Sequence, residues 1–241
     1  MAAGKGKRMR NPEKSKVMFE LKGKPMIEYV IDLSLKINSE LIVPIVGHQK
    51  NDVMDFISEK FAGEMGRILF AAQDEQLGTG HALMQTKDLL KDFAGDVLIL
   101  SGDVPLLKYE TVMKFLKFHY DDGFAASLLS ANFENPFGYG RVIRSIGGTL
   151  VDIVEEKDAA DDEKLIKEIN SGIYIVECGI LFEALETLKT DNAQGEYYLT
   201  DIFKYFRDKN IKIGAVPVEN NVEITGINTV EQLEELENLI D

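Results

Sequence analysis

The sequence predicts an α/β fold, with a doubly wound, mostly parallel sheet and a smaller α+β lobe attached to it. Two observations carry this prediction. Up to residue 123, short apolar runs alternate with segments whose apolar residues recur at helical spacing, and such alternation is typical of a parallel sheet covered by helices on both faces. After Phe124, strand-like runs follow one another with fewer helices between them. The chain of 241 residues is long enough to bury a large core.

The elements of the first part alternate in type. A helix is expected at Pro25–Lys36, because proline occupies its first turn and apolar residues follow at helical spacing. The further expected elements are a strand at Leu41–Gly47, a helix at Asp52–Phe61, a strand at Arg67–Gln73, a helix at Gly80–Leu90, a strand at Asp96–Ser101 and a helix at Tyr109–Tyr120.

The second part is richer in strands. The expected strands are Phe124–Leu129, Arg141–Ser145, Leu150–Glu155 and Ser171–Val176, with a polar stretch at Glu156–Lys167 and an acidic amphipathic helix at Thr229–Ile240. No linker rich in Pro, Gly or Ser separates the two parts. We therefore expect one domain over residues 1–241, with lobes at 1–123 and 124–228 and a C-terminal helix at 229–241.

The net charge limits the kinds of binding partner that we expect, and the cysteine content indicates the compartment. The net charge of −14 argues against nucleic acids and anionic membranes as partners. Cys178 is the single cysteine, which indicates a reducing compartment. No apolar run reaches membrane-spanning length, and no signal-peptide pattern opens the chain. We expect a cytoplasmic protein without a nucleic-acid or membrane partner.

The chain opens on a basic, glycine-containing loop, Gly4-Lys5-Gly6-Lys7-Arg8-Met9. Glycines let backbone N–H groups approach phosphate oxygens, and the cations supply charge, so the loop is suited to a nucleoside triphosphate. It is neither a dinucleotide fingerprint, because Met9 replaces the third glycine, nor a P-loop, because no Gly-Lys-Ser/Thr closes it. The alternative is a frayed, solvated tail.

Asp103 directly follows an apolar strand, in Gly102-Asp103-Val104-Pro105. Ligands of open α/β sheets bind beyond the carboxyl ends of the strands. Mg²⁺ takes carboxylate and phosphate oxygens together, so this position favours a metal ligand. The alternative is that Asp103 only builds the turn before Pro105.

Three further polar segments carry weaker signals. The loop from Gln73 to His81 contains two glycines and offers amides to a base or ribose, but Thr79 there is also a plausible helix cap. We leave His81 out of the catalytic residues. Asn228 with Glu231 three residues on has the form of a capping box, and Asn170 alone indicates a polar turn before a strand.

Together these segments resemble the bacterial N-acetylglucosamine-1-phosphate uridylyltransferases, the pyrophosphorylase half of the bifunctional enzymes that make UDP-N-acetylglucosamine, a precursor of peptidoglycan and lipopolysaccharide. The resemblance runs in order along essentially the whole chain. Its most selective motifs are Gln76-Leu77-Gly78-Thr79-Gly80-His81-Ala82 and Asn192-Ala193-Gln194-Gly195-Glu196-Tyr197-Tyr198-Leu199-Thr200-Asp201. It implies a Rossmann-like nucleotidyltransferase fold.

The resemblance also assigns roles to residues. On the nucleotide side it implies Ala2, Ala3, Gly4, Lys5, Gly6, Gln73, Gly78 and Thr79. On the sugar side it implies Gly140, Glu155, Asn170, Tyr198 and Thr200. Asp103 and Asn228 would bind Mg²⁺, and Arg8 and Lys16 would be the catalytic cations that neutralise the triphosphate. The lobe at 1–123 would then bind the nucleotide and the lobe at 124–228 the sugar.

The implied chemistry fits the residue types that the sequence offers. A sugar-1-phosphate already carries a nucleophilic oxygen, so the reaction needs no general base. The difficulty is to bring two polyanions together and to stabilise charge on the α-phosphate and the leaving pyrophosphate, which a metal ion with Arg and Lys achieves. UTP and a sugar-1-phosphate are therefore the expected small-molecule partners.

The sequence departs from the family pattern in several places. Ser15 stands where the family usually has Pro, and Lys7 where it has Thr. The resemblance implies an apolar strand of about four to five residues ahead of the opening loop, and its absence would expose two strand edges. We suspect a start site placed too late, and expect a chain that starts at Met1 to be poorly stable or inactive.

The family's acetyltransferase β-helix is also missing, so we expect no use of acetyl-coenzyme A. Because that β-helix drives trimer formation, we expect a monomer. Two alternatives to the uridylyltransferase stay open. One is a nucleotidyltransferase for another sugar-1-phosphate or another nucleoside triphosphate. The other is a non-catalytic sugar-nucleotide-binding module.

Overall fold

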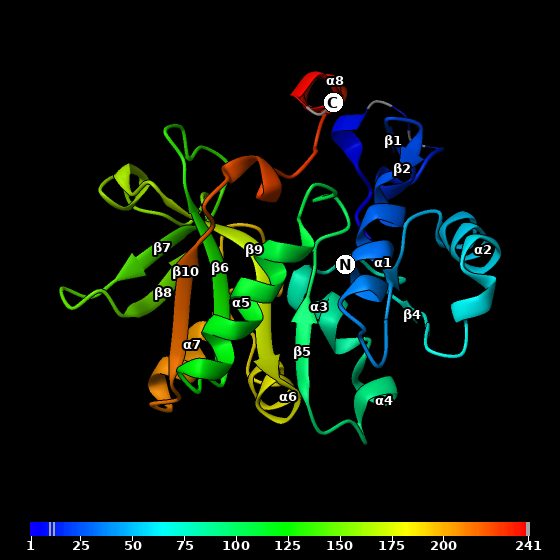
Figure 1. The fold of residues 1–241 in the computed structure, drawn as a ribbon. Coiled ribbons are helices and arrows are strands. Elements are labelled where there is room, and N and C mark those ends of the chain that lie inside the picture. Colours follow the sequence, from blue (N-terminus) through cyan, green and yellow to red (C-terminus); the bar gives the residue numbers. More distant parts are fainter. Residues whose placement is uncertain (10, 12, 240–241) are drawn as a thin grey trace.

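The fold was analysed in a computed structural model, which describes residues 1–9, 11 and 13–239 (Figure 1). Its strands are β1 (Glu20–Leu21), β2 (Lys24–Pro25), β3 (Ile45–Val46), β4 (Ala71–Ala72), β5 (Asp96–Ile99), β6 (Ala126–Asn132), β7 (Arg141–Arg144), β8 (Leu150–Val154), β9 (Glu168–Glu177) and β10 (Ile213–Pro217). Its α-helices are α1 (Met26–Lys36), α2 (Lys50–Lys60), α3 (Thr79–Met84), α4 (Lys87–Leu90), α5 (Tyr109–Asp121), α6 (Cys178–Leu185), α7 (Asp201–Asp208) and α8 (Val230–Leu239).

The main sheet joins the two parts of the chain through β9. Its strand order is β10-β6-β9-β7-β8, and β5 pairs with the C-terminal part of β9. Only β10 and β6 run parallel in this sheet, and its other pairs are antiparallel. The predicted α/β class is confirmed, but the sheet is mixed rather than mostly parallel, because β9 inserts between β6 and β5 in the opposite direction.

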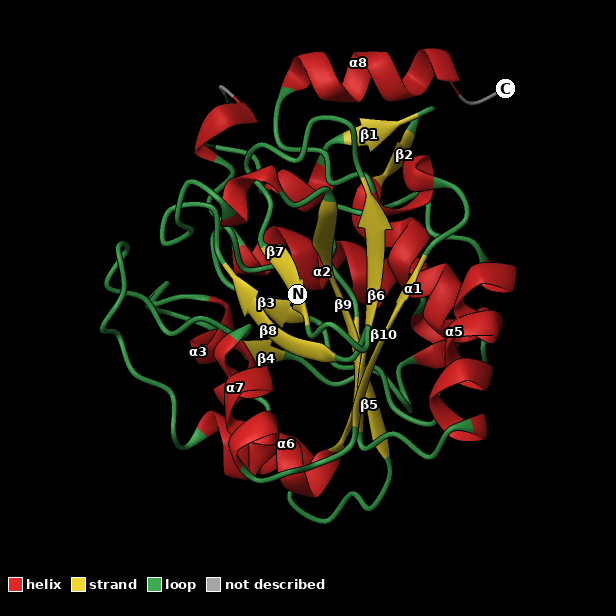
Figure 2. Ribbon diagram, turned by 90° about the vertical axis from the view of Figure 1, so that its left-hand side faces the viewer, coloured by secondary structure: helices red, strands yellow, loops and turns green. Residues whose placement is uncertain are grey.

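Helices cover both faces of this sheet, as the sequence predicted (Figure 2). Successive residues of β9 point to opposite faces. Tyr174 packs in the cluster that contains Phe203 and Phe206 of α7, whereas Ile173 packs in the cluster that contains Phe115 of α5. The domain therefore has helical layers on both sides of a strand core.

Residues 1–3 lie between β3 and the residues that follow β5. Ala2 forms a parallel bridge with Val46, and its N–H donates to the carbonyl of Ile45 at 2.8 Å. On the other side the α-amino group of Met1 donates to the carbonyl of Leu100 at 2.6 Å. The N-terminal residues thus run between the segment that ends in β3 and the segment that continues from β5.

The expected helices at Pro25–Lys36, Asp52–Phe61 and Tyr109–Tyr120 are present as α1, α2 and α5. The expected helix at Gly80–Leu90 is divided into α3 and α4, and the strand expected at Leu41–Gly47 is reduced to β3 plus a bridge between Ile42 and Ile68. The strand expected at Arg67–Gln73 is likewise reduced to β4 and that bridge. β3 and β4 therefore pair with each other over only two residues.

The C-terminal helix packs onto the N-terminal segment. Leu233 and Leu236 of α8 share a buried cluster with Met9, Leu21 and Met26, and α8 lies beside β1 in both views (Figures 1 and 2). The last two residues of the predicted helix, 240 and 241, lie outside the described residues. Sequence reasoning did not predict α6, α7 or β10. None of the helices in the described part of the chain is long and apolar enough to cross a membrane.

Candidate active site

The predicted nucleotide-side residues line one cavity of about 550 Å³. It lies beyond the C-terminal end of β5, where Ser101 and Asp103 follow the strand. The predicted residues in its wall are Ala2, Ala3, Gly4, Lys5, Gly6, Arg8, Lys16, Gln73, Gly78, Thr79, Asp103 and Asn228. These residues come from five separate stretches of the sequence, and the fold brings them together.

The opening loop is folded onto the site rather than frayed. Gly6 has a φ of +55°, and a Cβ placed there would lie 2.7 Å from Cβ of Lys16. A side chain at this position would therefore clash with the segment that carries Lys16. The hydrogen bonds among the described residues include none from the N–H of Gly4, Lys5 or Gly6, so these three donors are free for a ligand oxygen.

Two cations and two side-chain oxygens meet at one side of the cavity. Lys16 forms an ion pair with the carboxylate of Asp103, and its Nζ also donates to Oδ1 of Asn228 at 2.8 Å. Arg8 donates to the same Oδ1 at 2.9 Å. The side chains of Lys16 and Asp103 are 12% and 25% exposed, so their charges lie partly out of water. The positive charges of Arg8 and Lys16 are thereby held next to the side-chain oxygens of Asp103 and Asn228.

Asn228 does not form the capping box that its sequence context indicated. The N–H of Gln232 donates to Oγ1 of Thr229, and Oε1 of Gln232 accepts from the N–H groups of Asn228 and Thr229. The reciprocal cap is thus made by Thr229 and Gln232, one residue later. The side-chain oxygen of Asn228 faces Arg8 and Lys16 instead.

Another part of the cavity wall is formed by the loop around Gly78. The buried side-chain amide of Gln73 donates to the carbonyl of Gly78 at 3.0 Å and lies 3.2 Å from Nδ1 of His81. Thr79 does not cap its helix; its Oγ1 accepts from the N–H of Leu199 at 3.0 Å. His81 contacts Gln73 and lies outside the lining of the cavity.

Gly78 is required by its surroundings. Its φ is +114°, and a Cβ placed there would lie 2.5 Å from the carbonyl oxygen of Tyr197. Two backbone hydrogen bonds, from Tyr197 N to Leu77 O and from Gly80 N to Tyr197 O, join the two segments at 2.8 Å each. The two most selective sequence motifs therefore pack directly on each other.

The predicted sugar-side residues form a second group. The N–H of Asn170 donates to the carbonyl of Gly140 at 2.9 Å, and a Cβ at Gly140 would lie 3.5 Å from Oε2 of Glu155. Thr200 donates to Oε1 of Glu155 at 3.0 Å, and burial raises the pKa of the Glu155 carboxyl. Tyr198 donates to Asp158 at 3.1 Å.

This second group is next to the first cavity but does not line it. Glu155, Tyr198 and Thr200 line a separate cavity of about 610 Å³. Gly140 and Asn170 line neither of these two cavities. The structure therefore unites the predicted nucleotide and metal residues, and it keeps the predicted sugar residues as a neighbouring cluster around Glu155.

Sequence reasoning missed several residues of the site. Ser101, Gln76 and Glu196 line the first cavity, and the hydroxyl of Tyr174 donates to Oδ1 of Asn170 at 2.9 Å. Ser101 was detectable because it precedes Gly102 and Asp103 at the strand end. Gln76 and Glu196 were detectable because both lie inside the two selective motifs. No sequence pattern indicated a role for Tyr174, because an aromatic residue in a strand usually belongs to the hydrophobic core.

The side-chain oxygens of Asp103 and Asn228 are chemically suited as ligands of a hard divalent cation. These oxygens converge on one point, the ammonium of Lys16. The described residues contain no group of three or more His, Cys, Asp or Glu that would hold a metal by themselves. A cation bound here would therefore take its other ligands from water and from the phosphates of a substrate.

The profile of the nucleotidyl transferase family matches residues 1–221 of the chain. The chain belongs to this family. The α/β nucleotidyltransferase that the sequence predicts is thereby confirmed. The two selective motifs lie within the matched residues, and so does the lining of the cavity described above except for Asn228.

This nucleotidyl transferase chain is similar to two curated relatives that share a name. The chain is 44% identical over 240 residues to the bifunctional protein GlmU of Geotalea daltonii and to that of Thermoanaerobacter pseudethanolicus. The alignments cover 100% of this chain but 51% and 50% of the two relatives. The chain therefore spans about half the length of the curated relatives it matches, and the predicted resemblance to one half of a bifunctional protein is confirmed.

Solved structures support the fold. Apo UDP-glucose pyrophosphorylase superposes with a TM-score of 0.79 at 17% identity, covering 99% of this nucleotidyl transferase and 95% of that chain. UDP-glucose pyrophosphorylase complexed with UDP-glucose gives a TM-score of 0.73 at 20% identity, with coverage of 99% and 95%. At these identities the likeness concerns the fold alone.

Proposed function

We propose that the chain is a uridylyltransferase that forms UDP-N-acetylglucosamine and pyrophosphate from UTP and N-acetylglucosamine-1-phosphate. One observation carries the proposal: Arg8 and Lys16 meet Asp103 and Asn228 in the same cavity as the glycine loop. A site that joins free backbone donors, two cations and oxygen ligands suits a triphosphate with its metal ion. The identity to bifunctional GlmU proteins supports the choice of substrates.

We assign the two groups of residues separate roles, one in binding the nucleotide and the other in binding the sugar. In the lobe at 1–123, the loop from Ala2 to Gly6 binds the nucleotide from one side, and Gln73, Gly78 and Thr79 bind the uridine from the other. In the lobe at 124–228, the cluster of Gly140, Glu155, Asn170, Tyr198 and Thr200 orients the sugar. The packing of Tyr197 on Gly78 supports this arrangement, because it links the nucleotide wall to the segment that carries Tyr198 and Thr200.

The transfer needs positioning and charge more than acid–base chemistry. A phosphate oxygen of the sugar-1-phosphate forms a bond to the α-phosphorus of UTP, and the bond from that phosphorus to the bridging oxygen of pyrophosphate breaks. The attacking phosphate is already ionised, so no proton has to be removed. Arg8 and Lys16 bind phosphate oxygens and stabilise the negative charge that grows on the leaving pyrophosphate.

Asp103 and Asn228 would hold Mg²⁺, and the metal ion would supply further charge for the phosphates. In the structure their oxygens contact Lys16, which supports a binding place for one cation between them. We further propose that the protein works in the cytoplasm as a monomer on these small molecules, without a nucleic-acid or membrane partner. The single cysteine supports a reducing compartment.

The test is release of pyrophosphate from UTP and N-acetylglucosamine-1-phosphate with and without MgCl₂. The same assay is then run with CTP or dTTP in place of UTP, and with glucose-1-phosphate in place of the amino sugar. Turnover that requires Mg²⁺ and is highest with the first pair supports the proposal. Turnover highest with another pair would establish a different nucleotidyltransferase. Binding of UTP by calorimetry without turnover of any pair would establish a sugar-nucleotide-binding module.

A further inference from the structure

The longest strand of the main sheet, β9, is interrupted by a bulge directly after Asn170. β9 runs antiparallel to β6, where Ser130 lies opposite Asn170. The preceding residue of β6, Leu129, lies opposite Ile173, so two residues of β9 are extra in this register. A bulge redirects the side chains around it, and bulges are frequent next to active sites.

Hydrogen bonds hold the backbone of this bulge. Gly172 has a φ of +76°, which favours glycine over other residues. The hydroxyl of Ser171 donates to the carbonyl of Leu129. Before the bulge, the N–H of Asn170 donates to the carbonyl of Gly140 at 2.9 Å. The backbone on both sides of the Asn170 side chain is therefore fixed.

Two donors from inside the protein use the side-chain oxygen of Asn170. The hydroxyl of Tyr174 donates to Oδ1 at 2.9 Å, and the N–H of Gly172 donates to the same oxygen at 3.0 Å. A backbone N–H can only donate, so the atom that faces it is the amide oxygen and not the nitrogen. Burial raises the pKa of the Tyr174 hydroxyl, so this group also stays protonated and donates.

Packing fixes the position of the Tyr174 hydroxyl. The residue is 2% exposed, and the centre of its ring lies 5.3 Å from that of Phe203 in α7. A buried hydroxyl is costly unless it makes a hydrogen bond, and within the described residues this one bonds to Asn170 alone. The bond therefore satisfies the hydroxyl and orients the amide at the same time.

The NH2 group of Asn170 faces the open side of the bulge. Nδ2 donates to none of the described residues, and it is not one of their buried polar atoms without a partner, so solvent reaches it. A Cβ at Gly140 would lie 3.4 Å from Cβ of Asn170 and 3.5 Å from Oε2 of Glu155. A Cβ at Gly172 would lie 3.2 Å from Oγ of Ser101, a residue of the nucleotide-side cavity. Asn170 thus lies between that cavity and the cluster around Glu155.

We propose that Tyr174 is a positioning residue for the sugar-1-phosphate, because it holds the Asn170 amide with its oxygen inward and presents only the NH2 group to the substrate. The proposal rests on the function proposed above. Asn170 is then a donor without acceptor capacity, and it binds a substrate oxygen that accepts a hydrogen bond. Without the Tyr174 hydroxyl, the N–H of Gly172 alone holds the amide oxygen, and the substrate meets a less ordered donor.

The first test replaces Tyr174→Phe, which keeps the ring and removes the hydroxyl. We expect KM for N-acetylglucosamine-1-phosphate to rise about three- to ten-fold, the scale of losing one hydrogen bond, while KM for UTP stays within about two-fold. Tyr29→Phe is the matched control, since its hydroxyl donates to the carbonyl of Leu21 at 2.7 Å outside both cavities. An unchanged KM for the sugar phosphate, or an equal rise of both KM values, would overturn the proposal.

A double-mutant cycle separates positioning from a general structural role. If Tyr174 acts through Asn170, adding Tyr174→Phe to Asn170→Ala raises KM for the sugar phosphate no further. If Tyr174→Phe raises this KM by the same factor in the presence and in the absence of the Asn170 amide, Tyr174 does not act through Asn170 and the proposal is wrong.

Magnetic resonance of the chain with ¹⁵N-labelled asparagine and glycine tests the orientation without a substrate. The NH2 signals of Asn170 are assigned by their loss in Asn170→Ala. We expect no strong Overhauser contact between these protons and the amide proton of Gly172, and a strong contact would place the nitrogen inward and overturn the proposal. If the parent chain turns over no sugar-1-phosphate, the function proposed above fails, and this measurement still decides the orientation of Asn170.

Discussion

Lys16 and Asp103 form an ion pair between two segments that are far apart in the sequence, and Lys16 also donates to Asn228 at 2.8 Å. The ammonium therefore stands where the oxygens of Asp103 and Asn228 converge. By our proposal, a metal ion that binds these oxygens would displace Lys16, and the ammonium would then be free to turn toward a phosphate. The proposed exchange links metal binding to the position of the Lys16 ammonium, and variants of Asp103 and Lys16 test it.

Replacing Asp103→Asn keeps the shape of the side chain but removes its charge. We expect the rate of pyrophosphate release to fall roughly 10²-fold or more, the scale of losing one preorganised electrostatic contact. Thermal unfolding should stay within a few degrees of the parent protein, because the side chain is partly exposed. Asp92→Asn, at an exposed carboxylate outside the cavity, serves as the control. A folded Asp103→Asn protein with the parent rate would remove Asp103 from the site.

Replacing Lys16→Met removes the competing ammonium. We expect Mn²⁺, used as a probe for the divalent site, to bind roughly ten-fold more tightly, since an ion pair no longer has to break and a like charge is gone. Turnover should fall at the same time, because the phosphate loses a cation. Calorimetry measures the Mn²⁺ affinity, with Lys14→Met as the matched control at a partly exposed lysine outside the cavity. Unchanged or weaker Mn²⁺ binding would contradict the exchange.

Gly78→Ala tests the wall of the cavity. The new Cβ meets the carbonyl of Tyr197 at 2.5 Å in a backbone conformation with φ +114°, so we expect a loss of roughly 2–4 kcal/mol in the free energy of unfolding. UTP affinity should fall as well, because the loop has to move. Urea unfolding and calorimetry measure the two effects. Gly63→Ala is the control, since its Cβ would meet nothing within 4 Å. Equal stability of the two variants would show that the loop adapts freely.

Much of the site could be predicted from the sequence because its residues occupy local positions with a chemical meaning. Asp103 follows a strand and the opening loop combines glycines with cations, and both reach the cavity. The convergence of Lys16 on Asn228 depends on contacts between residues 212 positions apart, which no local pattern contains. The resemblance to a family supplied that link.

The fold was predictable to the extent that periodicity determines it. α1, α2 and α5 have clear helical spacing and were placed within about two residues of their observed ends. α7 was missed because its apolar residues, Ile202, Phe203 and Phe206, follow a polar turn and span only two turns. The direction of β9 was not predictable either, since pairing with β5, β6 and β7 is a long-range property.

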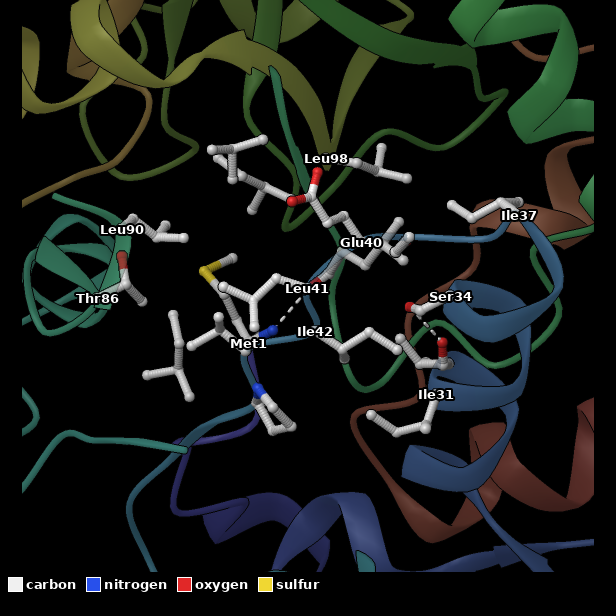
Figure 3. Close-up of a pocket in the computed structure, with 18 of the residues that line it drawn as sticks. Met1, Ile31, Ser34, Ile37, Glu40, Leu41, Ile42, Thr86, Leu90 and Leu98 are labelled. Carbon is white, nitrogen blue, oxygen red and sulfur yellow. Dashed lines mark hydrogen bonds between the residues drawn. The ribbon is translucent and has the colours of Figure 1, made fainter. Parts of the chain in front are cut away.

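In the 241-residue polypeptide with a free Met1 amine, we expect the buried α-amino group to give the free energy of unfolding a pH dependence with a definite sign. Its pKa falls from 8.0 in the unfolded chain to about 6 in the folded protein, because desolvation by burial outweighs the attraction of Asp103. Between these values the unfolded chain binds more protons, so stability rises with pH from about 6 to about 8, by at most roughly 2–3 kcal/mol. Urea unfolding of the free chain and of the Nα-acetylated chain measures this contribution as a difference. Burial also lowers the pKa of the His119 imidazole. This group and the carboxylates Glu40 and Asp96, which line the same apolar cavity as Met1 (Figure 3), occur in both proteins, so their effects on stability largely cancel. The same pH dependence in both would mean that the amine is solvated.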